Sequence, residues 1–278
     1  MNVKAWLQYA MERIPVVEYL LLINGVLSVG FSNWSLSAYF LGLTLLLLFF
    51  SCLRLMDDIK DYDKDIVANK DRPLPRGLVQ MDEAKKMVMF IWMGMVIVSL
   101  LTAFLWSAVL GITYFATTVY LYLMFKEFYI NEFLEKKPIL YGITHQVILI
   151  PLVLSAYFCF YEEGVEPKIL GHAVVVLAGF FQYEILRKMN PKADKILGYY
   201  LTHYGFKKVV FFVVCLMVLG LVSSYYSGAF FLILSMYVFV GAGLYLVSKD
   251  EEKFKLVETF ATVSLFMHLI SFFIAGLL

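Results

Sequence analysis

The chain has 278 residues, of which 62% are hydrophobic and 16% are charged, and its formal net charge is +1. Soluble domains contain roughly 45–50% apolar residues, so this composition excludes an ordinary soluble domain and predicts an all-α protein that crosses a membrane several times. In such a protein the places of the charges are more informative than their sum. We expect the lipid bilayer as a partner and no nucleic acid.

Apolar runs of about 17–25 residues, long enough to cross a hydrocarbon core of about 30 Å, occur nine times along the chain. The first 15 residues are amphipathic without a small-residue cleavage site, so we expect no removable signal peptide. The sequence predicts a single transmembrane domain over residues 1–278, a bundle of nine helices. The predicted spans are 16–32, 36–54, 86–106, 108–125, 138–158, 169–187, 207–225, 228–248 and 256–277.

Positive charges lie almost entirely on one side of this topology. All basic residues except Lys168, 22 of the 23, fall at the N-terminus, in the loops after spans two, four, six and eight, or at the span ends that border these loops. The positive-inside rule therefore predicts that this face is cytoplasmic, in the plasma membrane if the source is prokaryotic. Two of its loops, 54–77 and 182–208, are dense in charge. We expect them to face each other across a polar chamber that opens to the cytoplasm.

The stretch 54–77 is rich in aspartates. If it continues as a helix, Asp57, Asp61 and Asp65 follow one another at i, i+4 and i+8, and Asp58 lies three residues before Asp61, so several carboxylates share a face. Such a face repels itself unless a divalent cation neutralises it, and hard oxygen ligands favour Mg²⁺. Mg²⁺ usually shares its shell with phosphate oxygens, so a phosphorylated substrate is expected, held in part by the forked guanidinium of Arg72.

Other readings of the same stretch are a solvated connector, a calcium loop and a cation transporter. The alternating aspartates from Asp61 resemble an EF-hand, but Ile66 and Arg72 stand where that loop requires Gly and Glu, which excludes it. A transporter tends to place ionisable groups near the middle of its spans, whereas these acids gather at one end. The connector and the transporter stay as alternatives to an enzyme.

The second charged loop contains Glu184 and Asp194 as candidate metal ligands, with Arg187 and Lys188 as candidate phosphate contacts. Two histidines are candidate bases for proton removal: His145, in the fifth span, and His203, near the second loop. A lone histidine in a bundle is also commonly a hydrogen-bonded packing residue. Gln146, beside His145, either lines the chamber or ties helices together.

Several of these residues resemble the motifs of the UbiA superfamily of intramembrane prenyltransferases. The resemblance lies in Asp57-Asp58-x-x-Asp61-x-x-x-Asp65, the following Arg72-Pro73-Leu74-Pro75, Tyr122-x-x-x-Lys126 in span four, and, more loosely, Glu184 and Asp194 with Gly198 and Thr202 after span six. Two departures stand out. Asp57 replaces the usual Asn, and Arg187 and Lys188 stand where the family has further acids.

The resemblance implies a Mg²⁺-dependent enzyme that ionises an isoprenyl diphosphate and transfers the prenyl group to an aromatic or other small lipophilic acceptor. A member that cyclises the diphosphate without an acceptor, a terpene cyclase, is the alternative. The implied metal ligands, which are also the implied catalytic residues apart from Asp57, are Asp57, Asp58, Asp61, Asp65, Glu184 and Asp194. The implied diphosphate contacts are Arg54, Arg72, Lys126, Arg187 and Lys188.

Overall fold

The computed structural model describes residues 2–162, 164–189, 200–249 and 253–277. These residues contain helices and no β-strand, and nine helical segments among them are long and apolar enough to cross a membrane. The prediction of an all-α membrane bundle with nine spans is confirmed. The spans are α2 with η1 (Val16–Leu27 and Ser28–Asn33), α3 (Leu36–Lys60), α5 (Met81–Leu105), α6 (Ala108–Phe125), α8 with α9 (Pro138–Gln146 and Leu149–Phe158), α10 (Pro167–Arg187), α12 (Phe206–Ser227), α13 (Phe230–Lys249) and α14 (Phe254–Leu277).

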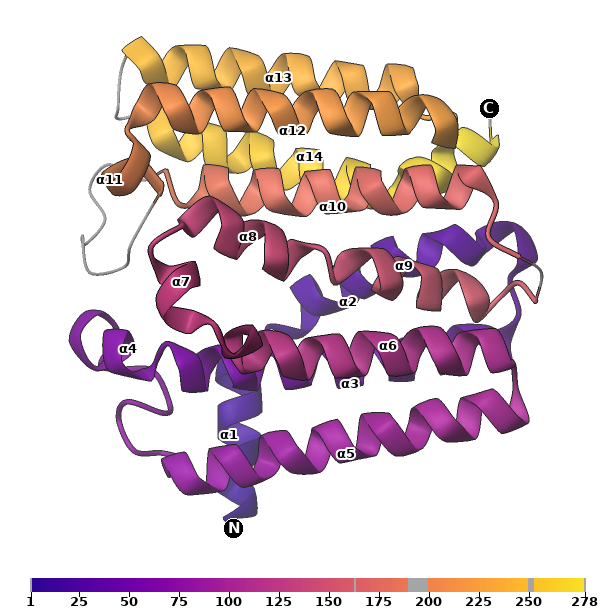
Figure 1. The fold of residues 1–278 in the computed structure, drawn as a ribbon, viewed down its shortest axis with the longest axis vertical. Coiled ribbons are helices and arrows are strands. Elements are labelled where there is room, and N and C mark those ends of the chain that lie inside the picture. The colour runs from indigo at the N-terminus through magenta and orange to yellow at the C-terminus, as the bar shows by residue number, and fades with distance from the viewer. Residues whose placement is uncertain (1, 163, 190–199, 250–252, 278) are drawn as a thin grey trace.

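Short helices gather at one end of the bundle. Figure 1 shows α4 (Tyr62–Ala68), α7 (Asn131–Glu135) and α11 (Tyr200–Tyr204) on the left, while the connection from α9 to α10 lies at the opposite end. The first helix, α1 (Val3–Arg13), stands upright in this view, across the direction of the spans. The segments that follow spans two, four and six therefore meet at the same end of the molecule.

Local signals explain where the spans turn. The side chains of Ser35 and Ser107 accept hydrogen bonds from the backbone N–H groups of Ala38 (3.2 Å) and Leu110 (3.4 Å), which caps α3 and α6. Gly228 ends α12 with a φ of +78°, a left-handed conformation that suits glycine. The turns at Ser107 and Gly228 produce two hairpins, in which α5 packs on α6 and α12 packs on α13.

Helix α10 lies in the core of the bundle, where it packs against α8, α9, α12 and α14. Close approach requires a small residue at Gly179, because a Cβ there would lie 2.7 Å from the imidazole Cγ of His268 on α14. Close packing on several sides holds α10 in place. Glu184, in the last turn of this helix, is therefore fixed relative to the rest of the bundle.

Two spans differ from the predicted ranges in ways that affect the charged end. Helix α3 continues to Lys60, six residues beyond the predicted end of span two, so Asp57 and Asp58 belong to the spanning helix itself. The fifth span is divided between α8 and α9 by a turn at residues 147–148, directly after Gln146. Apolar composition alone shows neither feature, because polar residues can extend a helix and apolar residues can form a turn.

Candidate active site

The acidic stretch follows a nearly continuous helical path from α3 into α4. Asp61 separates the two helices, with φ −84° and ψ 0°. The backbone N–H of Asp61 donates to the carbonyl of Asp57 (2.9 Å), and that of Asp65 donates to the carbonyl of Asp61 (2.8 Å). The predicted i, i+4 order of the acids is therefore present, although their side chains have different partners.

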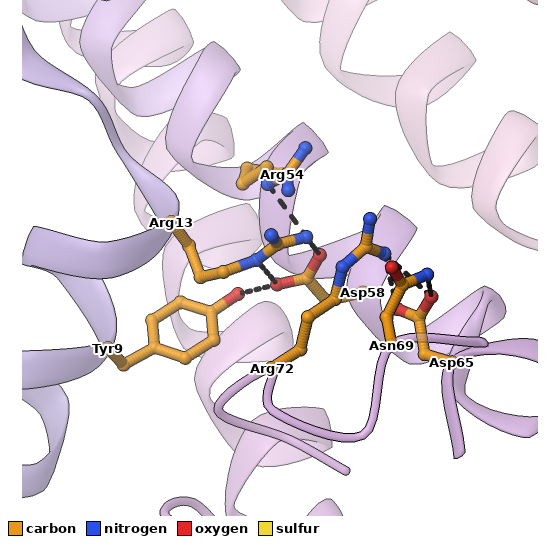
Figure 2. Close-up of polar contacts among 7 residues, drawn as sticks. All are labelled: Tyr9, Arg13, Arg54, Asp58, Asp65, Asn69 and Arg72. Carbon is orange, nitrogen blue, oxygen red and sulfur yellow. Dashed lines mark hydrogen bonds and ion pairs between the residues drawn. The ribbon is translucent and has the colours of Figure 1, made fainter. Parts of the chain in front are cut away.

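Asp58 is buried and its carboxylate binds groups from α1 (Figure 2). The Tyr9 hydroxyl donates to Oδ2 (2.7 Å) and Arg13 Nε donates to the same oxygen (2.8 Å). Arg54 Nε lies 3.6 Å from Oδ1 on the other side. Burial and the carboxylate raise the pKa of Tyr9, so its hydroxyl keeps its proton and remains a donor. Asp58 thus faces α1 and Arg54.

Asp65 is 2% exposed and is held by the turn that follows α4. Arg72 Nη1 donates to both carboxylate oxygens (2.7 and 2.5 Å), and the amide of Asn69 donates to Oδ1 (2.8 Å). Figure 2 places this cluster beside the Asp58 cluster. In this structure Arg72 closes the turn onto Asp65, which neutralises the charge of that carboxylate.

Asp57 and Asp61 behave differently from the other two acids. Among the described residues, no side-chain hydrogen bond or ion pair reaches either carboxylate. Both charges act on each other, and the charges of Arg54 and Lys60 act on Asp57. Two neighbouring carboxylates with spare lone pairs are the oxygen ligands that a hard divalent cation prefers.

Lys60 lies at the centre of a partly buried polar network. Its ammonium group donates to Glu127 Oε1 (3.0 Å), to the Tyr141 hydroxyl (2.8 Å) and to His145 Nε2 (3.2 Å). The Tyr141 hydroxyl in turn donates to Glu127 Oε1 (3.2 Å). The network ties the end of α3 to α8 and to the short helix η2 (Glu127–Tyr129) that follows α6.

The hydrogen bonds of His145 fix its tautomer. Nδ1 lies 2.8 Å from the backbone carbonyl oxygen of Tyr141, and because a carbonyl can only accept, Nδ1 carries the proton. Nε2 therefore presents a lone pair, which accepts the bond from Lys60. The ring also stacks on Tyr141, with centroids 3.9 Å apart. In this state His145 positions Lys60, and it can act as a base only when the Lys60 bond opens.

Backbone strain accompanies the network. Glu127, Phe128 and Tyr129 have φ values of 49°, 53° and 60°. Three consecutive non-glycine residues in the left-handed region are unusual, and such strain tends to gather at functional sites. The strained segment begins at Glu127, whose carboxylate contacts Lys60.

Glu184 is the centre of the second charged region. Its Oε2 accepts a hydrogen bond from the Gln146 amide (2.6 Å), and its Oε1 accepts bonds from Lys188 Nζ (2.8 Å) and the Tyr200 hydroxyl (3.2 Å). Burial and Glu184 raise the pKa of Tyr200, which keeps that hydroxyl protonated. Asp194, the other predicted acid of this region, lies outside the described residues.

Helix α8 joins the two charged regions. Consecutive residues on this helix, His145 and Gln146, bind Lys60 of the first region and Glu184 of the second. The charges of Glu127 and Glu184 both act on the His145 ring, so they lie around the same side chain. Asp57 and Glu184, which are 127 positions apart in the chain, are thus linked through Lys60 and His145: the charge of Lys60 acts on Asp57 and on His145, and the charge of Glu184 acts on His145.

The remaining predicted residues lie nearer the surface. Lys126 is exposed, with its ammonium 5.7 Å from the centroid of the Tyr122 ring, and Arg187 is exposed over the ring of Tyr183 (6.0 Å). His203 is exposed and lies edge-on to Tyr204. Among the residues that the structure describes, no contact joins these three side chains to the acids, so their predicted roles stay predictions.

The carboxylates of this region are suitable ligands for Mg²⁺, but their contacts limit how many of them are available to bind it. Within the described ranges, no three His, Cys, Asp or Glu side chains lie together in a way that could hold a metal. Asp58, Asp65 and Glu184 are already bound by cationic side chains, which leaves Asp57 and Asp61. Two protein carboxylates are a usual number for Mg²⁺ that shares its shell with substrate phosphates and water.

The polar chamber also stays a prediction. A cavity of about 640 Å³ lies at the opposite end of the bundle, where Ser32, Tyr161, Lys168 and Phe272 are among its lining residues. None of the predicted site residues lines it.

Sequence reasoning missed the partners of the motif residues. Lys60 lies inside the acidic motif, Glu127 directly follows Lys126, and Tyr141 lies four residues before His145, so each stands beside a residue that draws attention away from it. Tyr9 and Arg13 are spaced i, i+4, which places both on one face of an amphipathic helix. That spacing was the available signal, but the sequence does not show that this face would meet Asp58.

Two comparisons with known proteins bear on this site. Residues 19–135 match the model of the UbiA prenyltransferase family, a range that contains the first acidic motif and Lys126. No curated protein matches the sequence significantly.

A solved structure described as giving structural and mechanistic insights into digeranylgeranylglyceryl phosphate synthase in membranes is similar in fold. The TM-score is 0.67 and the sequence identity is 18%, and the match covers 97% of this chain and 98% of that one. Both comparisons agree with the resemblance indicated by the acidic motif: residues 19–135 of this multi-pass membrane protein are similar in sequence to the UbiA prenyltransferase family, and nearly the whole chain is similar in fold to the solved structure.

Proposed function

We propose that this protein is a Mg²⁺-dependent membrane prenyltransferase that ionises an isoprenyl diphosphate and transfers the prenyl group to a small lipophilic acceptor. The observation that carries the proposal is the bridge made by α8. His145 on this helix binds Lys60 of the first acidic region, and the next residue, Gln146, binds Glu184 of the second. The UbiA family match and the fold of the similar synthase support prenyl transfer in general.

The arrangement of charge suits a diphosphate leaving group. Bound at Asp57 and Asp61 together with diphosphate oxygens, Mg²⁺ would stabilise the negative charge that grows on the leaving group. Lys126 supplies further positive charge near the same end of the bundle, and Arg72 and Lys188 would add theirs on turning from Asp65 and Glu184 toward the diphosphate. The bond between the allylic carbon and the diphosphate oxygen breaks, and its electron pair leaves with the diphosphate.

The apolar bundle suits the other product of that step. An allylic carbocation reacts with any water that reaches it, so the surrounding helices must exclude water until the acceptor attacks. The acceptor forms the new bond to the allylic carbon and then loses a proton. His145 Nε2 is a proton acceptor for this step once Lys60 withdraws, since Nδ1 already carries the ring proton.

We further propose that residues 1–278 form one transmembrane domain and that the end bearing the acidic regions faces the cytoplasm. The support is the charge distribution, in which Lys168 is the one basic residue assigned to the other face. Cysteine labelling from either side of sealed vesicles tests this. Labelling of an introduced Asp63→Cys from the outer side would contradict it.

Cyclisation of the isoprenyl diphosphate without an acceptor is the alternative outcome of the same ionisation. In that case a double bond of the substrate attacks the cation in place of an external acceptor. The ionising groups would be the same, so the structure of the charged end does not separate the two outcomes.

A product assay separates them. The purified protein is incubated with geranyl, farnesyl and geranylgeranyl diphosphates and Mg²⁺, with and without acceptors, and the products are identified by mass spectrometry. The acceptor panel includes aromatic acids and, because the similar structure is a digeranylgeranylglyceryl phosphate synthase, glyceryl phosphate lipids. A prenylated acceptor supports transfer, a cyclic hydrocarbon without acceptor supports cyclisation, and no consumption of any donor contradicts both.

A further inference from the structure

The N-terminal helix α1 presents three different faces. Trp6, Tyr9 and Arg13 face the bundle, where the rings of Trp6 and Tyr9 lie 5.4 Å apart. A second face, at i, i+4 and i+8, carries Val3, Leu7 and Met11, and a third carries Lys4, Gln8 and Glu12.

The face of α1 that packs on the bundle contacts the beginning of the acidic stretch, at Asp58. Tyr9 and Arg13 bind the carboxylate of Asp58 through bonds of 2.7 and 2.8 Å (Figure 2). Tyr9 is 4% exposed, so this contact is part of the packed interior.

The same turn of α1 also holds the end of the acidic stretch. Glu12 accepts two hydrogen bonds from the guanidinium of Arg76 (2.9 and 2.7 Å). Arg76 closes the turn that contains Arg72, because it also donates to the carbonyl of Asp71 (2.7 Å). One short helix therefore fixes both limits of the segment that carries the candidate metal ligands.

The apolar face of α1 has no protein partner among the described residues. Val3, Leu7 and Met11 are 65%, 61% and 73% exposed. An amphipathic helix with such a stripe lies in the plane of a membrane surface, with its apolar side at the boundary of headgroups and acyl chains.

Two further observations identify the bilayer as what covers this face. Figure 1 shows α1 upright across the direction of the spans, which is the direction of the membrane plane. The first span begins with further exposed apolar residues, Val16, Val17, Leu20 and Leu21, and these face lipid if α2 crosses the bilayer. The stripe on α1 is therefore followed in the chain, within a few residues, by a surface that faces lipid.

We propose that α1 is a membrane-surface helix that couples the bilayer interface to the acidic stretch. Its Val3, Leu7 and Met11 face enters the interface, its Lys4, Gln8 and Glu12 face meets water, and Tyr9, Arg13 and Glu12 hold Asp58 and Arg76 in place. The helix precedes residues 19–135, the range of the family match. The proposal does not depend on the reaction.

Spin labels test the placement of the faces directly. Single cysteines replace Leu7 and Met11 on the apolar face and, as a matched control one position after Leu7, Gln8, in a background with Cys215→Ser. In nanodiscs, labels at 7 and 11 should collide with oxygen more than with a water-soluble nickel chelate, and the label at 8 should show the opposite. Equal, water-like accessibility at 7, 8 and 11 overturns the proposal, and so does exclusion of both reagents at 7 and 11, which indicates a protein partner such as a second copy of this chain.

Proteolysis tests the coupling to the acidic stretch. Leu7→Glu places a charge on the lipid face, whereas Gln8→Glu places the same charge on the water face. Trypsin cleavage after Arg76 in nanodiscs should become about tenfold faster or more in Leu7→Glu, because a leucine-sized apolar anchor is lost, and should change little in Gln8→Glu. Equal rates in the two variants, both with the native melting temperature, overturn the coupling.

These readouts separate this proposal from the proposed function. Both use the whole protein and neither measures turnover. A protein that consumes no isoprenyl diphosphate would still show the labelling pattern and the difference in proteolysis, while failure of these tests would leave the prenyltransferase assignment untouched.

Discussion

The ammonium group of Lys60 and the carboxylate of Glu127 lie 3.0 Å apart, at the junction of α3, η2 and α8. Their side chains are only 14% and 19% exposed. An ion pair that is largely shielded from water adds little net stability but makes the loss of one partner costly, because the other charge then stays shielded without a partner. The pair therefore fixes the relative positions of the elements that it joins.

Removing one member of this pair should destabilise the protein more than removing both. We expect Lys60→Met to cost about 3–5 kcal/mol of unfolding free energy, and we expect the double variant Lys60→Met/Glu127→Gln to recover a large part of that loss. Denaturant unfolding in detergent, analysed as a double-mutant cycle, measures the coupling. Additive losses would show that the two charges do not interact.

Asp57→Asn and Asp61→Asn should each remove most of the turnover. Both carboxylates lack a partner among the described residues, so they are the acids most available to a metal, and we expect a loss of about 100-fold or more, comparable to the loss of one transition-state contact. The Mg²⁺ concentration for half-maximal rate should rise. Asp63→Asn, on the exposed side of α4, is the matched control. A similar loss of turnover in that variant would show that the net negative charge of the segment matters, and that metal ligation by Asp57 and Asp61 does not explain the loss.

Gln146→Leu should impair the second charged region without unfolding the protein. The substitution removes the 2.6 Å hydrogen bond to Glu184, so this carboxylate can turn toward Lys188 and Tyr200. We expect KM for the isoprenyl diphosphate to rise several-fold, with a smaller change in kcat. An unchanged KM in Gln146→Leu would show that the hydrogen bond from α8 does not position Glu184 for substrate binding.

The attachment of α1 should weaken in acid. Hydrogen bonds from Arg76 and Gln8 lower the pKa of Glu12 from its ordinary value of 4.5. A carboxylate with a lowered folded pKa contributes stability above its unfolded pKa and loses that contribution as the pH falls through the folded value. The mobility of a spin label on α1 at Lys4→Cys should therefore rise below about pH 4.5. In Arg76→Gln, the part of this rise in label mobility that depends on the Glu12–Arg76 ion pair should vanish. If the rise is the same in Arg76→Gln as in the unsubstituted protein, protonation of Glu12 is not its cause.

The sequence predicted the spans well because membrane crossing imposes a simple requirement of length and apolarity. Span boundaries at the charged end were less accurate: the polar residues up to Lys60 continue α3, and the apolar residues after Gln146 break the fifth span. Intrahelical hydrogen bonds form with polar side chains as readily as with apolar ones, so composition does not reveal where a helix ends.

The candidate site was predictable as a set of charged loops but not as a set of contacts. Two equivalent-looking aspartates, Asp57 and Asp58, are adjacent in sequence, yet only Asp58 meets Arg13. The difference depends on where α1 docks and which side of α3 it covers. Long-range packing decides this, and no local pattern in the acidic motif encodes it.

The adjacent positions of His145 and Gln146 on α8 limit the insertions and deletions that this protein can tolerate. Neighbouring residues on a helix point about 100° apart, which is why one can reach α3 while the next reaches α10. Inserting or deleting a single residue between Pro138 and Gln146 would rotate both side chains away from their partners while leaving the span long and apolar enough to enter the membrane. The phase of this one helix, more than its composition, is what related sequences would have to preserve.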